Sequence, residues 1–356
     1  MKRVAVIGAG QTAYGVFPER TLKDIFAASA APCGGSTTRK ASSATALNSN
    51  RRRTMPSEAP HRDDETRRLR TVGLVGCGTM GIGIAIVAAR GGCVTLLHDA
   101  DRSRIRRARA DIAAFLQKSV ALGKMTAAEA GAALDRLRDA DDLARLADCD
   151  LVIEAVFEDS AAKGEVLRAL HAACRPDTVF ATNTSTLSVT RLAAASGRPE
   201  RVVGLHFCLP AQLMKLVEVT PGLRTDEEAV ARAWAFCEET GQIPVRTRDT
   251  PGFILNRFAI PLNNRAIRMV EQGIATAADI DAAVRTGLGH PLGPLELVDL
   301  VGLDTQLRLC DAFYASTQDA ELACPSLVRQ MVAAGWLGKK AGRGFYRYDS
   351  TRTFGA

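Results

Sequence analysis

The sequence predicts an α/β protein in which a doubly wound parallel sheet is followed by an all-helical C-terminal domain. Between residues 71 and 249, short apolar runs of strand character alternate with helical stretches, and this alternation is typical of parallel sheets. After residue 250 the β-branched runs become sparse and helical periodicity prevails. Residues 31–70 are rich in Ser, Thr, Arg, Ala and Pro and have no apolar face to bury, so we expect disorder in this N-terminal leader. The 356 residues therefore divide into four expected segments, 1–30, 31–70, 71–249 and 250–356.

Each strand of the expected sheet is a short apolar run. The strand segments are, in chain order, 71–76, 93–100, 150–156, 178–184, 201–207 and 215–220. An apolar helix is expected over 79–92 and a long amphipathic helix over 101–125, while 126–150 is expected to form helices and loops. The clearest helical patterns of the C-terminal domain cover 253–273, 277–287 and 294–316.

The composition excludes several classes of protein. No apolar run approaches the roughly 18 to 20 residues of a membrane helix, and no secretory signal is evident. The net charge of +7 is concentrated in the first 70 residues, so the remainder has no general attraction for nucleic acids, although the Arg-rich leader leaves nonspecific contact open. The nine cysteines form no CxxC pair, which is typical of reduced thiols in the cytoplasm. The five histidines have no metal-ligand spacing, so we predict no metal.

A glycine turn joins the first strand of the sheet to its helix in the stretch VGLVGCGTMGIG. In this G-x-G-x-x-G pattern, Gly76 permits the tight turn, Gly78 lets the backbone approach a pyrophosphate, and Gly81 lets the helix pack closely on the strand. The N-terminus of the helix adds partial positive charge for the phosphates. We therefore predict a Rossmann-type nucleotide site that includes Thr79 and Met80 of the same turn.

The strand that follows ends in Asp99, eighteen residues after Gly81. A carboxylate at this place accepts hydrogen bonds from both ribose hydroxyls and repels a 2′-phosphate, which favours NAD over NADP. Arginines follow closely and leave NADP as the alternative; they are Arg102, Arg104, Arg106 and Arg107.

A second glycine turn, VAVIGAGQTAYG, lacks this context. Pro18 interrupts any helix that opens at its glycines, and no further strand with a terminal acid follows before the leader. Residues 1–30 instead resemble the first strand, loop and helix of thiolases of the acetyl-CoA acetyltransferase type, but the rest of a thiolase is missing. We interpret the segment as a remnant and Met55 as the natural start.

A nicotinamide cofactor needs a partner that handles a proton while hydride moves, and histidine is suited to this near neutral pH. Three histidines follow Asp99. His171 lies on a helix face beside alanines and His290 lies in a Pro/Gly turn, so both are interpreted as structural. His206 ends a strand at the carboxyl edge, where open sheets bind ligands. That position alone is equally compatible with a buried core residue.

Three neighbours favour a catalytic role for His206. Glu218, on the next strand, could hydrogen-bond the imidazole and stabilise its charged form. Ser185 of ATNTST and Asn256 of PGFILNR could polarise a substrate oxygen without adding charge.

Residues 72–348 resemble the short-chain L-3-hydroxyacyl-CoA and 3-hydroxybutyryl-CoA dehydrogenases. The stretches that carry the resemblance occur in family order: VGLVGCGTMGIGIA, DLVIEAVFED, ATNTSTLSVT, GLHF, MKLVEV, DTPGFILNR, GHPLGPLELVDLVGLDT and GKKAGRGFY. The resemblance implies that His206 takes the proton of the 3-hydroxyl and that Glu218 orients it. It further implies that Ser185 and Asn256 hold the substrate oxygen.

The same resemblance implies further NAD contacts at Glu158, Lys163 and Lys340, besides Ser185. The alternatives are a solvated charge for Lys340 and a surface ion pair for Glu158 and Lys163. An acyl-CoA substrate and a homodimer formed through the helical domain are also implied.

Four residues depart strongly from the family pattern, and Thr186 replaces a Ser of that pattern in a milder change. GLHFCLP replaces GLHFFNP, so that Leu209 stands where an Asn contacts the nicotinamide end and Cys208 stands where a Phe is usual. Phe115 and Leu122 replace a Ser and a Lys that grip coenzyme A. Two alternatives to the acyl-CoA dehydrogenase therefore stay open, a dehydrogenase of a free hydroxy acid or sugar acid on the same fold and a catalytically inactive NAD-binding protein.

Overall fold

The computed structural model describes residues 69–348. The thiolase-like segment, almost all of the leader and Met55 lie outside the described residues. Within them an eight-stranded sheet has the order β3-β2-β1-β4-β5-β6-β7-β8. Its strands are β1 Thr71–Val75, β2 Val94–His98, β3 Leu137–Asp139, β4 Leu151–Glu154, β5 Val179–Thr182, β6 Val202–Phe207, β7 Leu216–Pro221 and β8 Ile243–Arg246.

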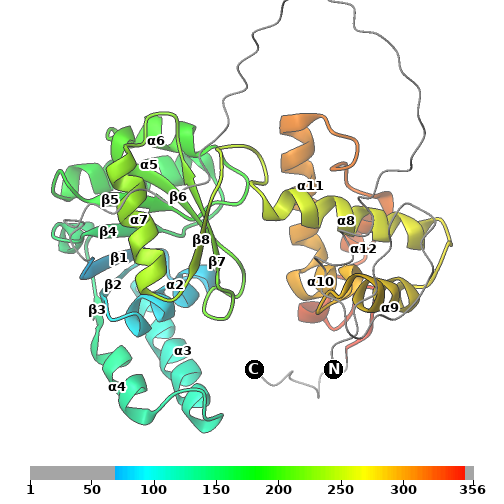
Figure 1. Cartoon of the computed structure of the whole chain (residues 1–356), viewed down its shortest axis with the longest axis horizontal. Coiled ribbons are helices and arrows are strands. Elements are labelled where there is room, and N and C mark those ends of the chain that lie inside the picture. Colours follow the sequence, from blue (N-terminus) through cyan, green and yellow to red (C-terminus); the bar gives the residue numbers. More distant parts are fainter. Residues whose placement is uncertain (1–68, 349–356) are drawn as a thin grey trace, which may run out of the picture. The chain divides into compact units, whose positions relative to one another are not determined.

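Helices cover both faces of this sheet (Figure 1). One face packs its apolar residues against α2, α3, α4 and α7, and the other face packs against α5 and α6. The bounds are α2 Thr79–Arg90, α3 Arg102–Ala121, α4 Ala127–Asp135, α5 Ser160–Ala173, α6 Val189–Ser196 and α7 Glu227–Glu239. The predicted doubly wound α/β architecture is therefore confirmed. Because the strand order reverses between β1 and β4, the crevice for a ligand is expected at the carboxyl ends of these two strands.

The sheet is parallel from β3 to β6 but not throughout, which corrects the prediction. β6 and β7 pair in antiparallel fashion, and β7 pairs in parallel with β8. The reason is the short connection of residues 208–215, because a parallel crossover needs about a dozen residues or more. β3 and β8 were missed because they are short edge strands without a buried apolar run, unlike β4 and β5, whose four residues are all buried.

The C-terminal segment is all helical, as predicted, and its helices pack on one another around a core of their own (Figure 1). They are α8 Leu255–Glu271, α9 Ala277–Leu288, α10 Pro294–Val301, α11 Leu303–Thr317 and α12 Ser326–Ala333. The single helical pattern predicted over 294–316 is divided at Gly302, whose φ of 105° is outside the helical range. No helix within residues 69–348 is long and apolar enough to cross a membrane.

Candidate active site

The histidine on β6 is held between two polar side chains. His206 and Glu218 are directly opposite each other in the β6–β7 pairing. Nδ1 of His206 is 2.6 Å from Oε2 of Glu218, and Nε2 is 3.0 Å from Oγ of Ser185. Since an ionised carboxylate only accepts hydrogen bonds, Nδ1 carries a proton, and in the neutral imidazole Nε2 is then the nitrogen with the lone pair. The imidazole is thus fixed in the tautomer that a general base requires.

Glu218 uses both of its oxygens. Oε1 accepts hydrogen bonds from the backbone N–H groups of Ile254 and Leu255 at 2.7 and 2.9 Å, at the start of α8. Burial alone would raise the pKa of Glu218, but the hydrogen bonds from His206 and from these N–H groups hold that pKa below its ordinary value. The buried carboxylate therefore stays ionised and joins β6, β7 and α8 at one point.

A phenyl ring packs beside the imidazole. The ring centroids of His206 and Phe253 are 5.5 Å apart, and Phe253 is 4% exposed. The φ of Phe253 is 46°, a left-handed conformation that a bulky residue rarely adopts. Sequence reasoning missed this residue, although its stretch DTPGF marks the start of the helical domain.

Ser185 lies in a turn after β5 that is held by a single carboxylate oxygen. Oε1 of Glu158 accepts the N–H groups of Ser185 and Thr186 at 2.8 and 2.9 Å, and the hydroxyl of Thr184 at 2.6 Å. Burial raises the pKa of Glu158, but Lys163 and these hydrogen bonds outweigh that effect and lower it. The position of Ser185 opposite His206 is therefore fixed through its backbone.

The alternative of a surface ion pair does not hold for Lys163, because its side chain has no exposed area. Its ammonium group lies 2.9 Å from Oε1 of Glu154 and 3.4 Å from Oε2 of Glu158. It also donates to the carbonyl of Asn183 at 3.2 Å. In this arrangement Lys163 reaches the site through Glu158 and has no open surface for a direct contact with a cofactor. The buried partner Glu154 had no signal in the sequence, because it reads as the end of an apolar strand.

The glycine turn between β1 and α2 has the geometry that its pattern predicts. Gly76 has a φ of 101°, and a Cβ there would lie 2.7 Å from the carbonyl oxygen of Ala155. A Cβ on Gly81 would lie 1.9 Å from the carbonyl oxygen of Gly76. A Cβ on Gly78, by contrast, would meet no atom within 4 Å. Space is therefore open above the N-terminus of α2, where Gly78 provides no side-chain cap and a phosphate fits.

Asp99 is anchored to this turn. Its Oδ2 accepts the N–H of Cys77 at 2.8 Å and its Oδ1 accepts the N–H of Asp101 at 2.9 Å. The carboxylate thus lies beside the glycines, where a ribose would be bound. The open cradle and the neighbouring carboxylate both fit NAD.

Two predicted residues are not brought to His206 by any contact in the described part of the chain. Asn256 is the second residue of α8 and is partly exposed, and its neighbour Leu255 contacts Glu218. Lys340 is paired with Asp304 at 2.6 Å, with its side chain 48% exposed.

The histidines interpreted as structural differ in their surroundings. Nδ1 of His171 accepts a hydrogen bond from Nε of Arg198 at 3.2 Å, which fits a structural role, and His290 is exposed.

Of the four strong departures from the family pattern, two are packed in the interior and two are exposed to solvent. Cys208 is buried and Phe115 packs against the core of the sheet domain. Burial, with a smaller effect of Glu218, raises the pKa of Cys208 to about 11, so the thiol is neutral. Leu209 and Leu122 are about half exposed, at 47% and 51%.

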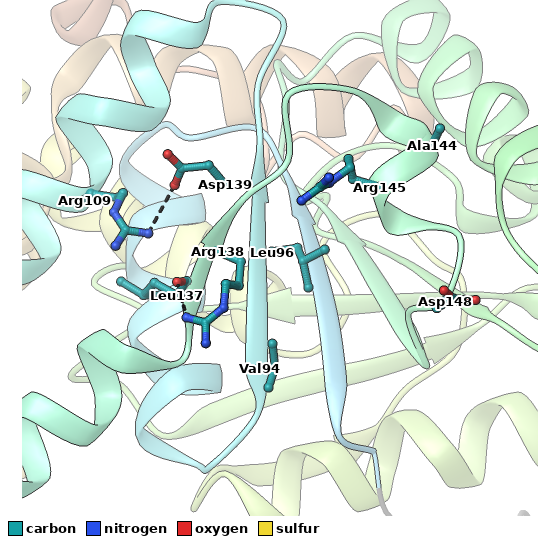
Figure 2. A pocket seen from close by; sticks show the side chains of 9 residues that line it. All are labelled: Val94, Leu96, Arg109, Leu137, Arg138, Asp139, Ala144, Arg145 and Asp148. Carbon is teal, nitrogen blue, oxygen red and sulfur yellow. Dashed lines mark hydrogen bonds and ion pairs between the residues drawn. The ribbon is translucent and has the colours of Figure 1, made fainter.

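A hollow of about 980 Å³ opens elsewhere, at the β2–β3 edge of the sheet (Figure 2). It is lined by Val94, Leu96, Arg109, Leu137, Arg138, Asp139, Ala144, Arg145 and Asp148. None of these residues belongs to the His206 site or the glycine turn, and Arg109 is paired with Asp139 across its rim. The volume of this hollow is therefore not evidence that the reaction takes place in it.

In a comparison with known proteins, almost all of the described residues match two domains of one protein family. The 3-hydroxyacyl-CoA dehydrogenase NAD binding domain matches residues 71–250, and the C-terminal domain of the same family matches residues 252–348. A 3-hydroxybutyryl-CoA dehydrogenase of Mycobacterium tuberculosis is 44% identical over 79% of this chain and 99% of its own length.

Solved structures agree with these matches. The crystal structure of M. tuberculosis FadB2 superimposes with a TM-score of 0.78 at 44% identity and covers 80% of this chain and 100% of its own. That of (S)-3-hydroxybutyryl-CoA dehydrogenase PaaH1 from Ralstonia eutropha has a TM-score of 0.76 at 36% identity, over 79% and 100% of the two chains. The chain belongs to the 3-hydroxyacyl-CoA dehydrogenase family, and its cofactor is NAD.

Proposed function

We propose that the protein oxidises (S)-3-hydroxyacyl-CoA, with 3-hydroxybutyryl-CoA as the preferred substrate, to the 3-ketoacyl-CoA and catalyses the reverse reduction. The contact chain Ser185–His206–Glu218, with distances of 3.0 and 2.6 Å, carries this proposal. The short acyl chain rests on the relatives, which are named 3-hydroxybutyryl-CoA dehydrogenases. NAD, when bound, accepts the hydride from C3 of the substrate.

In the oxidation, Nε2 of His206 takes the proton of the 3-hydroxyl group. Glu218 stays ionised, accepts the Nδ1 proton and stabilises the imidazolium that forms. Phe253 covers the ring and limits the access of water. In the reduction, His206 returns the proton to the forming alkoxide.

Ser185 and Asn256 have a second task in this proposal, which is to hold the substrate oxygen. The hydroxyl of Ser185 already lies at hydrogen-bond distance from Nε2, so a substrate oxygen beside this pair is within reach of both groups. Glu158 and Lys163 keep the Ser185 turn in place. Lys340, in the helical domain, contacts the cofactor.

The decisive test is the loss of NADH on addition of acetoacetyl-CoA. We expect turnover that falls by about 10²- to 10⁴-fold in His206→Ala, which is the usual contribution of a general acid–base group. Free acetoacetate, run in parallel, should react far more slowly. Faster reaction of the free acid would favour the hydroxy-acid alternative, which rests on Phe115, Leu122 and Leu209. NADH binding without turnover of either substrate would favour the inactive protein.

We also propose that the protein is a cytoplasmic homodimer that associates through its helical domain. Seven cysteines of the described part are free thiols, and six of these seven are buried, which supports a reducing compartment. Ile260 and Ile267 of α8 are core residues, but Phe258 of the same helix is 75% exposed and Leu288 of α9 is 66% exposed. Light scattering after gel filtration should give twice the chain mass, and Phe258→Glu should reduce it to one chain.

A further inference from the structure

The loop after β4 exposes a phenyl ring next to a guanidinium group. Phe157 is 72% exposed, and Cζ of Arg104 lies 5.6 Å from the centroid of its ring. Arg104 is held from the start of α3, because its Nε is 3.8 Å from Oδ2 of Asp101. Asp101 in turn caps the helix by accepting the N–H of Ser103 at 2.9 Å. The two planar groups therefore face each other across two separate elements.

The two elements that carry this pair are each linked to the glycine turn by hydrogen bonds. On one side, Asp99 accepts the N–H groups of Cys77 and Asp101, which links the turn to the first residues of α3. On the other side, the loop begins at Ala155, whose N–H donates to the carbonyl of Val75 at 2.8 Å. The ring and the guanidinium thus lie beyond the carboxylate that is suited to the ribose, at the adenosine end of the cofactor site.

We propose that Arg104 and Phe157 form the wall against which the purine of NAD packs. Aromatic rings and planar guanidinium groups both stack on nucleobases, and stacking does not require a particular pattern of hydrogen bonds. This proposal rests on NAD binding at the glycine turn. It gives Arg104 a task in base stacking, in contrast to the capture of a 2′-phosphate that an NADP-binding protein would need.

Phe157 of this wall lies in the same loop as Glu158, which positions the Ser185 turn of the active site. Phe157 immediately precedes Glu158, whose carboxylate holds the N–H of Ser185 at 2.8 Å. A purine packed on Phe157 restrains the same short loop that keeps Ser185 opposite His206. The adenosine end of the cofactor is therefore connected to the catalytic histidine by consecutive residues.

The test is the binding of NADH and of ADP-ribose, measured by calorimetry on the full-length protein. ADP-ribose contains the adenosine end but lacks nicotinamide, so it reports on the purine wall without turnover. For Phe157→Ala we expect the Kd of both ligands to rise by about 10- to 100-fold, the range that loss of one base–aromatic stack produces. Phe157→Trp restores binding to within about threefold, because it keeps an aromatic face.

Arg104→Ala should raise both Kd values by about three- to tenfold, as expected for an exposed cation–π partner. Arg106→Ala removes the same charge from an exposed position of α3 that lies about 200° around the helix from Arg104. It is the matched control, with a change below about twofold. Equal effects of the two arginine variants would show that only the overall charge of α3 matters and would overturn the proposal.

Two further outcomes separate this inference from the proposed function. If Phe157→Ala binds ADP-ribose as tightly as the unaltered protein does, while NADH turnover is normal, the purine wall is wrong and the dehydrogenase activity stands. If the unaltered protein binds neither NADH nor ADP-ribose, both the cofactor site and the wall are wrong.

Discussion

At the scale of single residues, the site depends on carboxylates that accept several hydrogen bonds at once. Glu218 accepts one bond from His206 and two from the start of α8. Glu158 accepts the backbone of the Ser185 turn and contacts Lys163. An amide in either place presents donors where only acceptors fit. Conservative replacements at these two positions are therefore not neutral.

Replacement of Glu218 by Gln should separate catalysis from binding. The amide cannot stabilise an imidazolium, and its NH₂ group faces either Nδ1 of His206 or the N–H groups at α8. We expect kcat for acetoacetyl-CoA reduction to fall by about 10²- to 10⁴-fold. NADH affinity should change little, since the glycine turn is untouched. A kcat within threefold of the unaltered enzyme would contradict the assigned role of Glu218.

Replacement of Glu158 by Gln should change the pH dependence of stability. Since the pKa of Glu158 is lowered in the folded state, its ionised form contributes stability above the unfolded pKa of about 4.3, and that contribution is lost as the pH falls through the folded value. The difference in unfolding free energy between the two proteins should therefore be clear at pH 7 and clearly smaller at about pH 3, below the unfolded pKa. Urea titrations at both pH values measure it. Glu165→Gln, at an exposed position of α5, is the control; a difference that grows in acid would refute the assignment.

At the scale of elements, two connections assemble the site. The short link between β6 and β7 forces an antiparallel pair and places His206 opposite Glu218. A shift of this pairing by one residue would turn one of the two side chains to the other face of the sheet. The glycine turn between β1 and α2 brings the helix so close to the strand that a side chain on Gly81 has no room.

The two glycines should therefore respond differently to alanine. Gly81→Ala places a methyl group against the backbone of Gly76 and should destabilise the protein by about 2–4 kcal/mol, seen as a lower Tm. Gly78→Ala meets open space at a φ of −80°, so its Tm should stay close to that of the unaltered protein. Its NADH affinity should nevertheless fall, because the methyl group occupies the phosphate cradle. Tight NADH binding by Gly78→Ala would argue against phosphates at this turn.

At the scale of the whole molecule, the family domains match residues 71–250 and 252–348, within the part of the chain that the structure describes. Leu69, the first described residue, is 3% exposed. The carboxylate of Asp150 accepts the N–H groups of Arg70 and Thr71 at 2.8 and 3.0 Å, which secures the first strand.

A chain that starts at Met55 should therefore keep its activity. We expect kcat and the KM for NADH within about twofold of the full-length values, since both family domains and all residues assigned to the site follow residue 70. The Tm should also be unchanged. Steady-state kinetics and thermal unfolding of the two proteins measure this. A large loss of NADH affinity would assign a binding role to the segment before Met55.

Sequence patterns were sufficient where the physics is local. The spacing of Gly76, Gly78 and Gly81 reflects steric limits within one turn, and Asp99 follows from the length of a single strand–helix–strand unit. The alternation of apolar runs and helices likewise predicted the α/β architecture. Edge strands such as β3 escaped because three residues are too few for a periodic signal.

By itself the sequence determined the architecture, the nucleotide turn and the cofactor class, because these depend on short-range sterics and on patterns of burial. It determined the family through the resemblance of its motifs to a known one. Only the tertiary structure decided that the ammonium of Lys163 is buried against Glu154 and that Glu218 also caps α8. The same holds for the φ of 46° at Phe253 and for the contact between Arg104 and Phe157. These features join elements that are distant in the sequence. Their energetics depend on burial and on partners that appear only when the strands and helices are packed.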